Sequence, residues 1–156
     1  MTNTATLVPD EIFGHRTAGL DWTHLPGSSR FDYPIDYSIA LLQADPATQT
    51  VEFLTLWAPD AYCHFHQHLG PTRSVVIGGE LHVYETDIHL DVHKTRRTGH
   101  ESANDGGDIH MEQAGPGGAL VYYAMQARDG RLFDILTRDR QVLRTLSFED
   151  FAEGRI

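Results

Sequence analysis

The sequence predicts an all-β domain, built as a sandwich or a barrel. Short segments that alternate apolar and polar residues, such as 51–57 and 80–85, recur along the chain and are separated by turn signals. No segment shows the period of a long amphipathic helix. No repeat and no low-complexity linker divides the chain, so we expect a single domain.

The composition limits the classes of function. The chain has 156 residues, enough for a sizeable core, and 40% of them are hydrophobic. Its net charge of −10 disfavours nucleic acid and anionic membrane surfaces as partners. The single cysteine, Cys63, excludes an internal disulfide and fits a reducing compartment. Because the sequence shows neither a signal peptide nor a stretch of membrane-spanning length, we expect a soluble, cytoplasmic protein.

Residues 1–34 are expected to form an N-terminal arm that packs on a main body formed by residues 35–156. The arm carries scattered Pro and Gly residues and a turn signal at 26–29. A short strand or turn is expected near 20–22, where Trp22 would anchor the arm to the body.

Strands are expected throughout the main body. In chain order they cover 38–43, 51–57, 73–77, 80–85, 119–125, 132–136 and 142–143. Gly78-Gly79 predicts a tight hairpin or bend, and 128–131 is the best hairpin turn in the chain. Residues 147–150 have the spacing of a capping box and predict a short C-terminal helix. The polar segment 87–97 fits no pattern.

Three histidines stand at alternate positions soon after the strand expected at 51–57. If the extended backbone continues, His64, His66 and His68 point to one face of a strand, with next-but-one residues about 7 Å apart. Two such imidazoles can lean together and share a cation at about 2.0–2.2 Å from each nitrogen. The alternative is a polar strand edge that faces solvent. Three histidines in alternation favour the metal site.

A metal held by two strand histidines needs at least one more ligand from another strand, and His110 is the best candidate. The spacings resemble the two sequence motifs of the cupin superfamily, over about residues 60 to 115. The matching patterns are His66-x-His68-x4-Arg73-x5-Gly79 and Gly99-x5-Asp105-x-Gly107-x2-His110. The resemblance implies a single-domain cupin, that is, a double-stranded β-helix or jelly-roll barrel. His66, His68 and His110 would then hold a divalent metal ion inside the barrel.

The chain departs from these motifs at several positions. The carboxylate position of the first motif holds Arg73, or Thr72 in a tighter alignment. Asp105 replaces the usual proline of the second motif, and its closing asparagine falls at Ala114. The missing carboxylate predicts a site of three histidines rather than three histidines and one glutamate.

The segment 66–71, His-Gln-His-Leu-Gly-Pro, is similar to that of cupins of the acetylacetone dioxygenase and 2,4′-dihydroxyacetophenone dioxygenase type, as is the run 127–132. This resemblance implies a non-haem Fe(II) dioxygenase that cleaves a carbon–carbon bond next to a carbonyl. Its substrates would be O₂ and a small diketone or aromatic hydroxyketone, and many cupins are homodimers. Donor chemistry alone admits Fe(II), Zn(II), Ni(II) or Cu(II).

Two assignments within the site stay open. His64 and His66 form an alternative ligand pair, with Gly78 ending the motif; we prefer His66 and His68 because the following Leu-Gly-Pro matches the family position. The guanidinium of Arg73 either binds a substrate carboxylate or enolate oxygen or is an outward surface charge.

Other residue types near the motifs are expected to be structural. Cys63 is expected to be a buried thiol, and Tyr122, Tyr123 and Met125 to form core and pocket wall. Surface positions are expected for four further histidines, His82, His89, His93 and His100.

Two other functions remain open. One is a metal-bearing or ligand-binding sensor without turnover, as in the cupin domain of bacterial anti-sigma factors; the lack of an attached helical domain favours a free-standing enzyme. The other is a redox-neutral Zn(II) or Ni(II) isomerase or lyase, whose activity would not need O₂.

Overall fold

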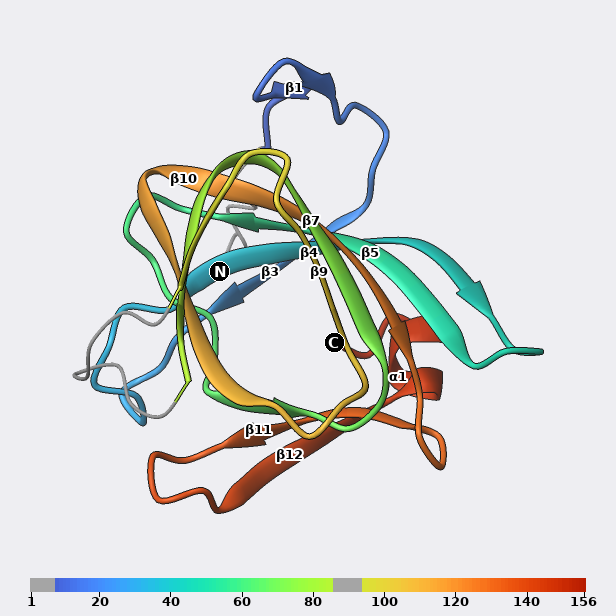
Figure 1. The fold of residues 1–156 in the computed structure, drawn as a ribbon. Coiled ribbons are helices and arrows are strands. Elements are labelled where there is room, and N and C mark those ends of the chain that lie inside the picture. Colours follow the sequence, from blue (N-terminus) through green and yellow to red (C-terminus); the bar gives the residue numbers. More distant parts are fainter. Residues whose placement is uncertain (1–7, 86–93) are drawn as a thin grey trace, which may run out of the picture.

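The computed structural model describes residues 8–85 and 94–156. Antiparallel strands form one large sheet that curls into a half-barrel, and a short helix lies near the C-terminus (Figure 1). The elements are β1 (Glu11–Ile12), β2 (His15–Arg16), β3 (Trp22–Pro26), β4 (Asp36–Asp45), β5 (Thr50–Trp57), β6 (His66–His68), β7 (Thr72–Tyr84), β8 (Lys94–Arg97), β9 (Glu101–Asn104), β10 (Ile109–Gln126), β11 (Arg131–Leu136), β12 (Val142–Ser147) and α1 (Phe148–Ala152). The all-β fold predicted from the sequence is confirmed.

Strand β10 organises the sheet. Its first residues pair with β6, its last residues pair with β5, and β7 runs along most of its length. The sheet order is β12-β11-β6-β10-β5-β4-β3, while β8 and β9 extend it from β7. This pairing brings β6 and the start of β10 side by side, although they are far apart in the chain.

The glycine pair at 78–79 makes a bend within one strand, not a hairpin between two. Strand β7 runs through it without interruption, and its register with β10 shifts between Ala114 and Ala119. Gly79 has a φ of 75°, and a Cβ there would lie 2.2 Å from the carbonyl oxygen of Gly118. Only glycine fits such a left-handed position against a neighbouring backbone.

Replacing Gly79 by Ala should therefore destabilise the barrel. We expect a loss of about 3 kcal/mol in the free energy of unfolding, from the left-handed φ and from the clash with the facing strand. Urea denaturation followed by circular dichroism measures it. Gly130 provides the control because it has a similar φ of 76° with no atom within 4 Å of an added Cβ. If both variants lost equal stability, close packing at the bend would not be the cause.

The main apolar cluster fills the inside of the curled sheet. Phe53 stacks on Tyr123 with ring centroids 5.4 Å apart, and Phe151 of α1 packs against both Phe53 and Phe133. Helix α1 thus closes part of the barrel with an aromatic side chain that is fully buried.

A second apolar cluster covers the outer face of the sheet. It joins Ile12 of the N-terminal segment to Leu54 of β5 and Leu120 of β10. Within the segment predicted as an arm, β3 pairs with β4 at the sheet edge, and a short strand or turn was expected near Trp22.

Two local predictions at the C-terminal end are confirmed. Ser147 and Asp150 form a reciprocal capping box at the start of α1. Asp129 and Gly130 both have positive φ, the geometry of a type I′ turn, and Arg128 bridges to Arg131 across it. Among residues 8–85 and 94–156, no helix combines the length and the apolar character needed to cross a membrane.

Candidate metal centre

Three buried histidines converge at the contact between β6 and β10. His66 and His110 are directly paired across these strands, and His68 lies two residues further on the same side of β6. The Nε2 atom of His68 is 3.1 Å from that of His66 and 3.0 Å from that of His110. Three ligands on one face of an octahedron, each about 2.1 Å from an ion, lie about 3.0 Å apart. The spacing of the nitrogens therefore fits a single divalent ion.

The second nitrogen of each β6 imidazole fixes where its proton lies. His66 donates from Nδ1 to the carbonyl oxygen of His64 at 2.6 Å. The hydroxyl of Thr72 donates to the carbonyl oxygen of Gly70, and so it accepts from His68 Nδ1 at 3.2 Å. Both Nε2 atoms then direct a lone pair into the cluster. Facing lone pairs repel each other unless a cation lies between them, so the donor set fits a metal ion.

Burial also keeps His68 and His110 uncharged. Burial, and next the neighbouring His66, lower the pKa of His68 and of His110 well below the usual histidine value. Burial lowers the pKa of the adjacent His64 to about 4. Neutral imidazole is the form that binds metal, so burial holds His68 and His110 in their ligand form.

The lowered pKa values predict that the metal-free protein loses stability in acid. Below about pH 6.5 the unfolded chain protonates these histidines while the folded protein keeps them neutral. Each such histidine should then remove up to about 1.4 kcal/mol per pH unit from the free energy of unfolding. Urea titrations of chelator-treated protein at pH 7.5 and 5.5 measure the loss. Equal stability at both pH values would contradict the expectation, and His68→Asn should reduce the slope.

Glu112, which sequence reasoning missed, places a carboxylate beside the cluster. Its side chain is 3% exposed and its Oε1 lies 3.8 Å from His110 Nε2. The hydroxyl of Tyr123 donates to this carboxylate, at 3.0 and 3.1 Å from its two oxygens. No Lys or Arg of the described ranges forms an ion pair with Glu112. A buried carboxylate needs positive charge nearby, which a metal ion in the cluster would supply.

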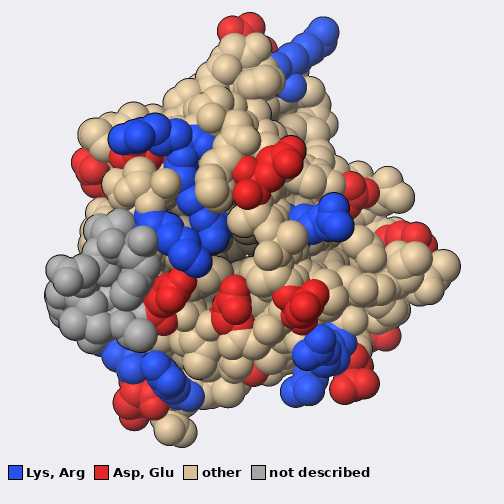
Figure 2. All heavy atoms as spheres, viewed as in Figure 1, with Lys and Arg blue, Asp and Glu red and all other residues tan. Residues whose placement is uncertain are grey.

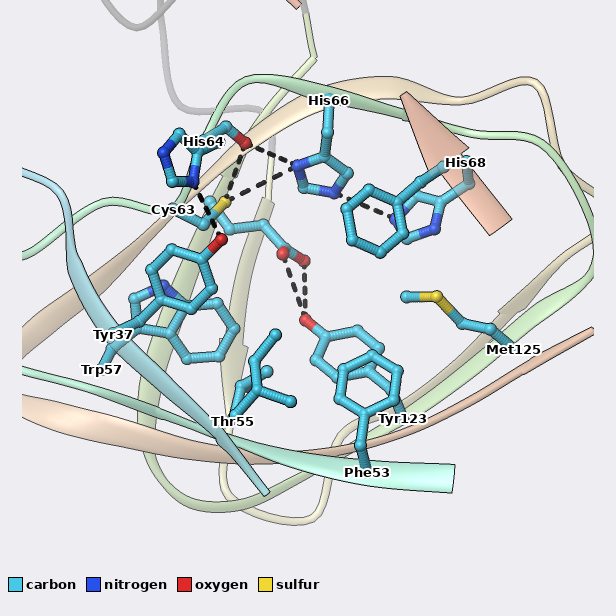
Figure 3. A pocket seen from close by; sticks show the side chains of 13 residues that line it. Tyr37, Phe53, Thr55, Trp57, Cys63, His64, His66, His68, Tyr123 and Met125 are labelled. Atoms are coloured by element: carbon cyan, nitrogen blue, oxygen red, sulfur yellow. Dashed lines mark hydrogen bonds between the residues drawn. The ribbon is translucent and has the colours of Figure 1, made fainter. Parts of the chain in front are cut away.

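A small cavity lies beside the histidines. Figure 3 shows His66 and His68 on one side of it and Tyr123, Phe53 and Thr55 on the other. Its volume is about 40 Å³, room for about three water molecules. The cavity suits the open positions of a metal ion and part of a small ligand. A larger ligand would have to displace wall side chains.

His64 lies at the edge of this cavity, outside the cluster. Strand β6 begins only at His66, so the expected single strand with three histidines on one face is shorter than predicted. The Nδ1 atom of His64 is 2.9 Å from the hydroxyl of Tyr37, and its ring packs edge-on against Phe31. The structure thus brings His66, His68 and His110 together and gives His64 other partners.

The flanking residues largely occupy the expected positions. Cys63 is buried, its thiol donates to the carbonyl oxygen of His64, and burial raises its pKa well above the usual value. Tyr123 and Met125 line the cavity. Tyr122, on the other face of β10, packs in the outer apolar cluster and donates to Glu52.

Arg73 is not brought to the histidines. Its side chain is exposed and lines an outer surface depression with Tyr122 and Glu101, because alternation along β7 turns it away from Thr72. His82 is partly buried and pairs with Glu80 at 2.8 Å, and His100 is exposed. The predictions for His89 and His93 lie outside the described residues.

Comparisons with known proteins show the fold. No family model matches the sequence, and no curated protein matches it either. Among solved structures, a proposed acetylacetone dioxygenase from Methylibium petroleiphilum PM1 is 17% identical over 96% of this chain and 98% of its own, with a TM-score of 0.66. An acetylacetone dioxygenase from Acinetobacter johnsonii is 17% identical over 84% of this chain and 83% of its own, with a TM-score of 0.64. An RmlC-like cupin from Ralstonia eutropha JMP134 is 15% identical over 86% and 79%, also with a TM-score of 0.64. Together with the curled sheet and the motif spacings, these similarities show that the chain has the cupin fold.

Proposed function

We propose that the protein is a metal-dependent oxygenase, a non-haem Fe(II) dioxygenase that cleaves a carbon–carbon bond next to a carbonyl. The observation that carries the proposal is the convergence of three buried imidazoles beside a small cavity, with the Nε2 lone pairs of His66 and His68 turned inward. The structural similarity to an acetylacetone dioxygenase supports the choice among cupin activities. The substrate would be O₂ together with a small diketone or an aromatic hydroxyketone.

The side chains of the site would have different roles. His66, His68 and His110 would hold the ion, and because a metal-bound imidazole carries no charge, they would leave the double positive charge of the ion undiminished. A bound Fe(II) ion would supply the reactivity toward O₂ and the Lewis acidity that a carbonyl substrate needs.

The cavity wall would exclude water and orient the ligand. Met125, Phe133 and Trp57 present apolar surface to the cavity. Glu112 can accept a hydrogen bond from a hydroxyl or enol of the ligand. Tyr123, which donates to it, holds the carboxylate in place.

Oxygen uptake tests the proposal. Metal-free protein is loaded under anaerobic conditions with Fe(II), Zn(II) or Ni(II), and diketones and hydroxyketones are supplied with and without O₂. We expect substrate cleavage with a matching uptake of O₂, only with Fe(II). Turnover without O₂ in the Zn(II) or Ni(II) protein would indicate an isomerase or lyase, and ligand binding without turnover would indicate a sensor.

The expected assembly and location stay predictions. The single cysteine is buried, which fits a protein of the cytoplasm. A homodimer is proposed, and light scattering of the protein at micromolar concentration would measure its mass.

A further inference from the structure

Strand β8 carries three cationic side chains, and one of them has no partner within residues 8–85 and 94–156. Lys94 pairs with Glu85 at 2.9 Å and Arg97 pairs with Glu80 at 3.4 Å. Arg96, between them, makes no hydrogen bond or ion pair with any residue of the described ranges, and its Nε atom is buried. A buried N–H without an acceptor is costly and rare in native proteins, so this one needs an explanation.

The pairing of β8 with β7 places Arg96 on the inner face of the sheet. Arg96 is opposite Leu81, which is fully buried in the main apolar cluster, and paired residues of neighbouring strands share a face. Leu81 is in turn opposite Ala114 of β10, which lies an even number of residues from His110. Arg96 therefore shares its face with the histidine cluster, and Arg97 lies on the opposite face.

The charge of Arg96 reaches the proposed metal centre. It is one of the causes that lower the pKa of His68 and of His110, after burial and the neighbouring histidine, and it also acts on the buried Tyr123. Figure 2 shows a hollow in this face of the molecule, with Lys and Arg side chains on the side of β7 and β8. None of the three guanidinium nitrogens of Arg96 has a partner in the described ranges, and of these only Nε is buried. The two terminal nitrogens therefore remain accessible to a ligand.

We propose that Arg96 binds the anionic oxygen of the ligand and so determines which substrates the site accepts. A bound divalent ion, the guanidinium of Arg96 and the carboxylate of Glu112 together leave an excess of positive charge, which favours a small monoanion over a neutral ketone. The forked N–H groups of arginine match an enolate or a carboxylate oxygen. This is one of the two roles that the sequence left open for Arg73. The proposal rests on the metal centre of the proposed function and names its substrate class.

Ligand binding tests whether Arg96 anchors the anionic oxygen. The protein is loaded with Zn(II), because this ion is redox-inactive and does not support a reaction with O₂. Calorimetry would compare acetylacetone (an enolate source), pyruvate (a carboxylate) and cyclohexanone (a neutral ketone). We expect Arg96→Gln to weaken binding of at least one of the two anionic ligands by about 10- to 100-fold, with little change for cyclohexanone. Arg97→Gln is the matched control, since it removes the neighbouring charge from the outer face. The ligand that loses affinity identifies the source of the anionic oxygen.

Arg96→Lys separates recognition from structure. Lysine keeps the positive charge but lacks the paired N–H groups of the guanidinium. The affinity of this variant for the anionic ligand should lie between those of the native protein and Arg96→Gln. The zinc content of all three proteins should be the same. Equal effects of Arg96→Gln and Arg97→Gln, or equal losses for anionic and neutral ligands, would overturn the anchor.

The oxygenase proposal can fail separately. Arg96-dependent binding of a monoanion without O₂ uptake by the Fe(II) protein would uphold the anchor and reject the oxygenase. If the Fe(II) protein took up O₂ and Arg96→Gln left the KM for the organic substrate unchanged, the oxygenase would be upheld and the role of Arg96 as an anchor rejected.

Discussion

Replacing His68 by Ala should lower the affinity for a divalent metal more than about 100-fold and abolish metal-dependent activity. Its Nε2 atom is within 3.1 Å of both other ligand nitrogens, and its side chain is 1% exposed. Removing it leaves two imidazoles, His66 and His110, on an ion that protein sites hold with at least three ligands. Metal content after dialysis against a weak chelator, followed by Co(II) titration, measures the effect.

His100→Ala is the matched control for this experiment. His100 is exposed and lies outside the cluster, so its removal should leave metal affinity unchanged. Circular dichroism of metal-free His68→Ala establishes that the barrel is intact. If His68→Ala bound metal as tightly as His100→Ala, the histidine cluster would not be the metal site.

Local patterns in the sequence predict much of the fold and the histidine cluster. Alternation of apolar residues predicts β5, and the turn residues Asp129-Gly130 predict the chain reversal that the structure contains. The spacing of His66 and His68 places both on one face of a strand wherever that strand lies. Linking His110 to them required the motif resemblance, because pairing between β6 and β10 is a long-range property.

The missed features depend on register and on long-range packing. Glu112 follows His110 by two residues, so alternation alone would have put both on one face had the start of β10 been recognised as a strand. Arg96 lies in a polar segment with no pattern of its own, and only its pairing with Leu81 turns it inward. In the sequence, Gly78-Gly79 is compatible with a turn between strands or a bend within one strand. Glycine indicates that a positive φ is possible, but it does not determine whether the strand continues.

Replacing Glu112 by Gln should have opposite effects on the metal-free and the metal-bound protein. Without metal, the change removes a buried carboxylate that pairs with no Lys or Arg of the described ranges, and we expect a gain of about 1–3 kcal/mol in the free energy of unfolding. With metal, the change removes the charge that partly balances the ion, and we expect affinity to fall about 10- to 100-fold. Chemical denaturation with and without Zn(II), and competition with a chelator, measure the two effects.

Tyr123→Phe is the counterpart of this variant. It keeps the carboxylate and removes the hydroxyl that donates to it, so the metal-free protein should lose about 1 kcal/mol of stability. Loss of stability in metal-free Glu112→Gln would show that the carboxylate is already satisfied without an ion, and the argument that it needs one would fail.

X-ray absorption at the metal edge of the loaded protein tests the central claim most directly, because it reports the atoms bound to the ion. The convergence of His66, His68 and His110 predicts three imidazole nitrogens at about 2.0–2.2 Å and no sulfur, since the thiol of Cys63 is buried and held protonated by its raised pKa. A sulfur neighbour at about 2.3 Å, or fewer than three imidazoles, would contradict it.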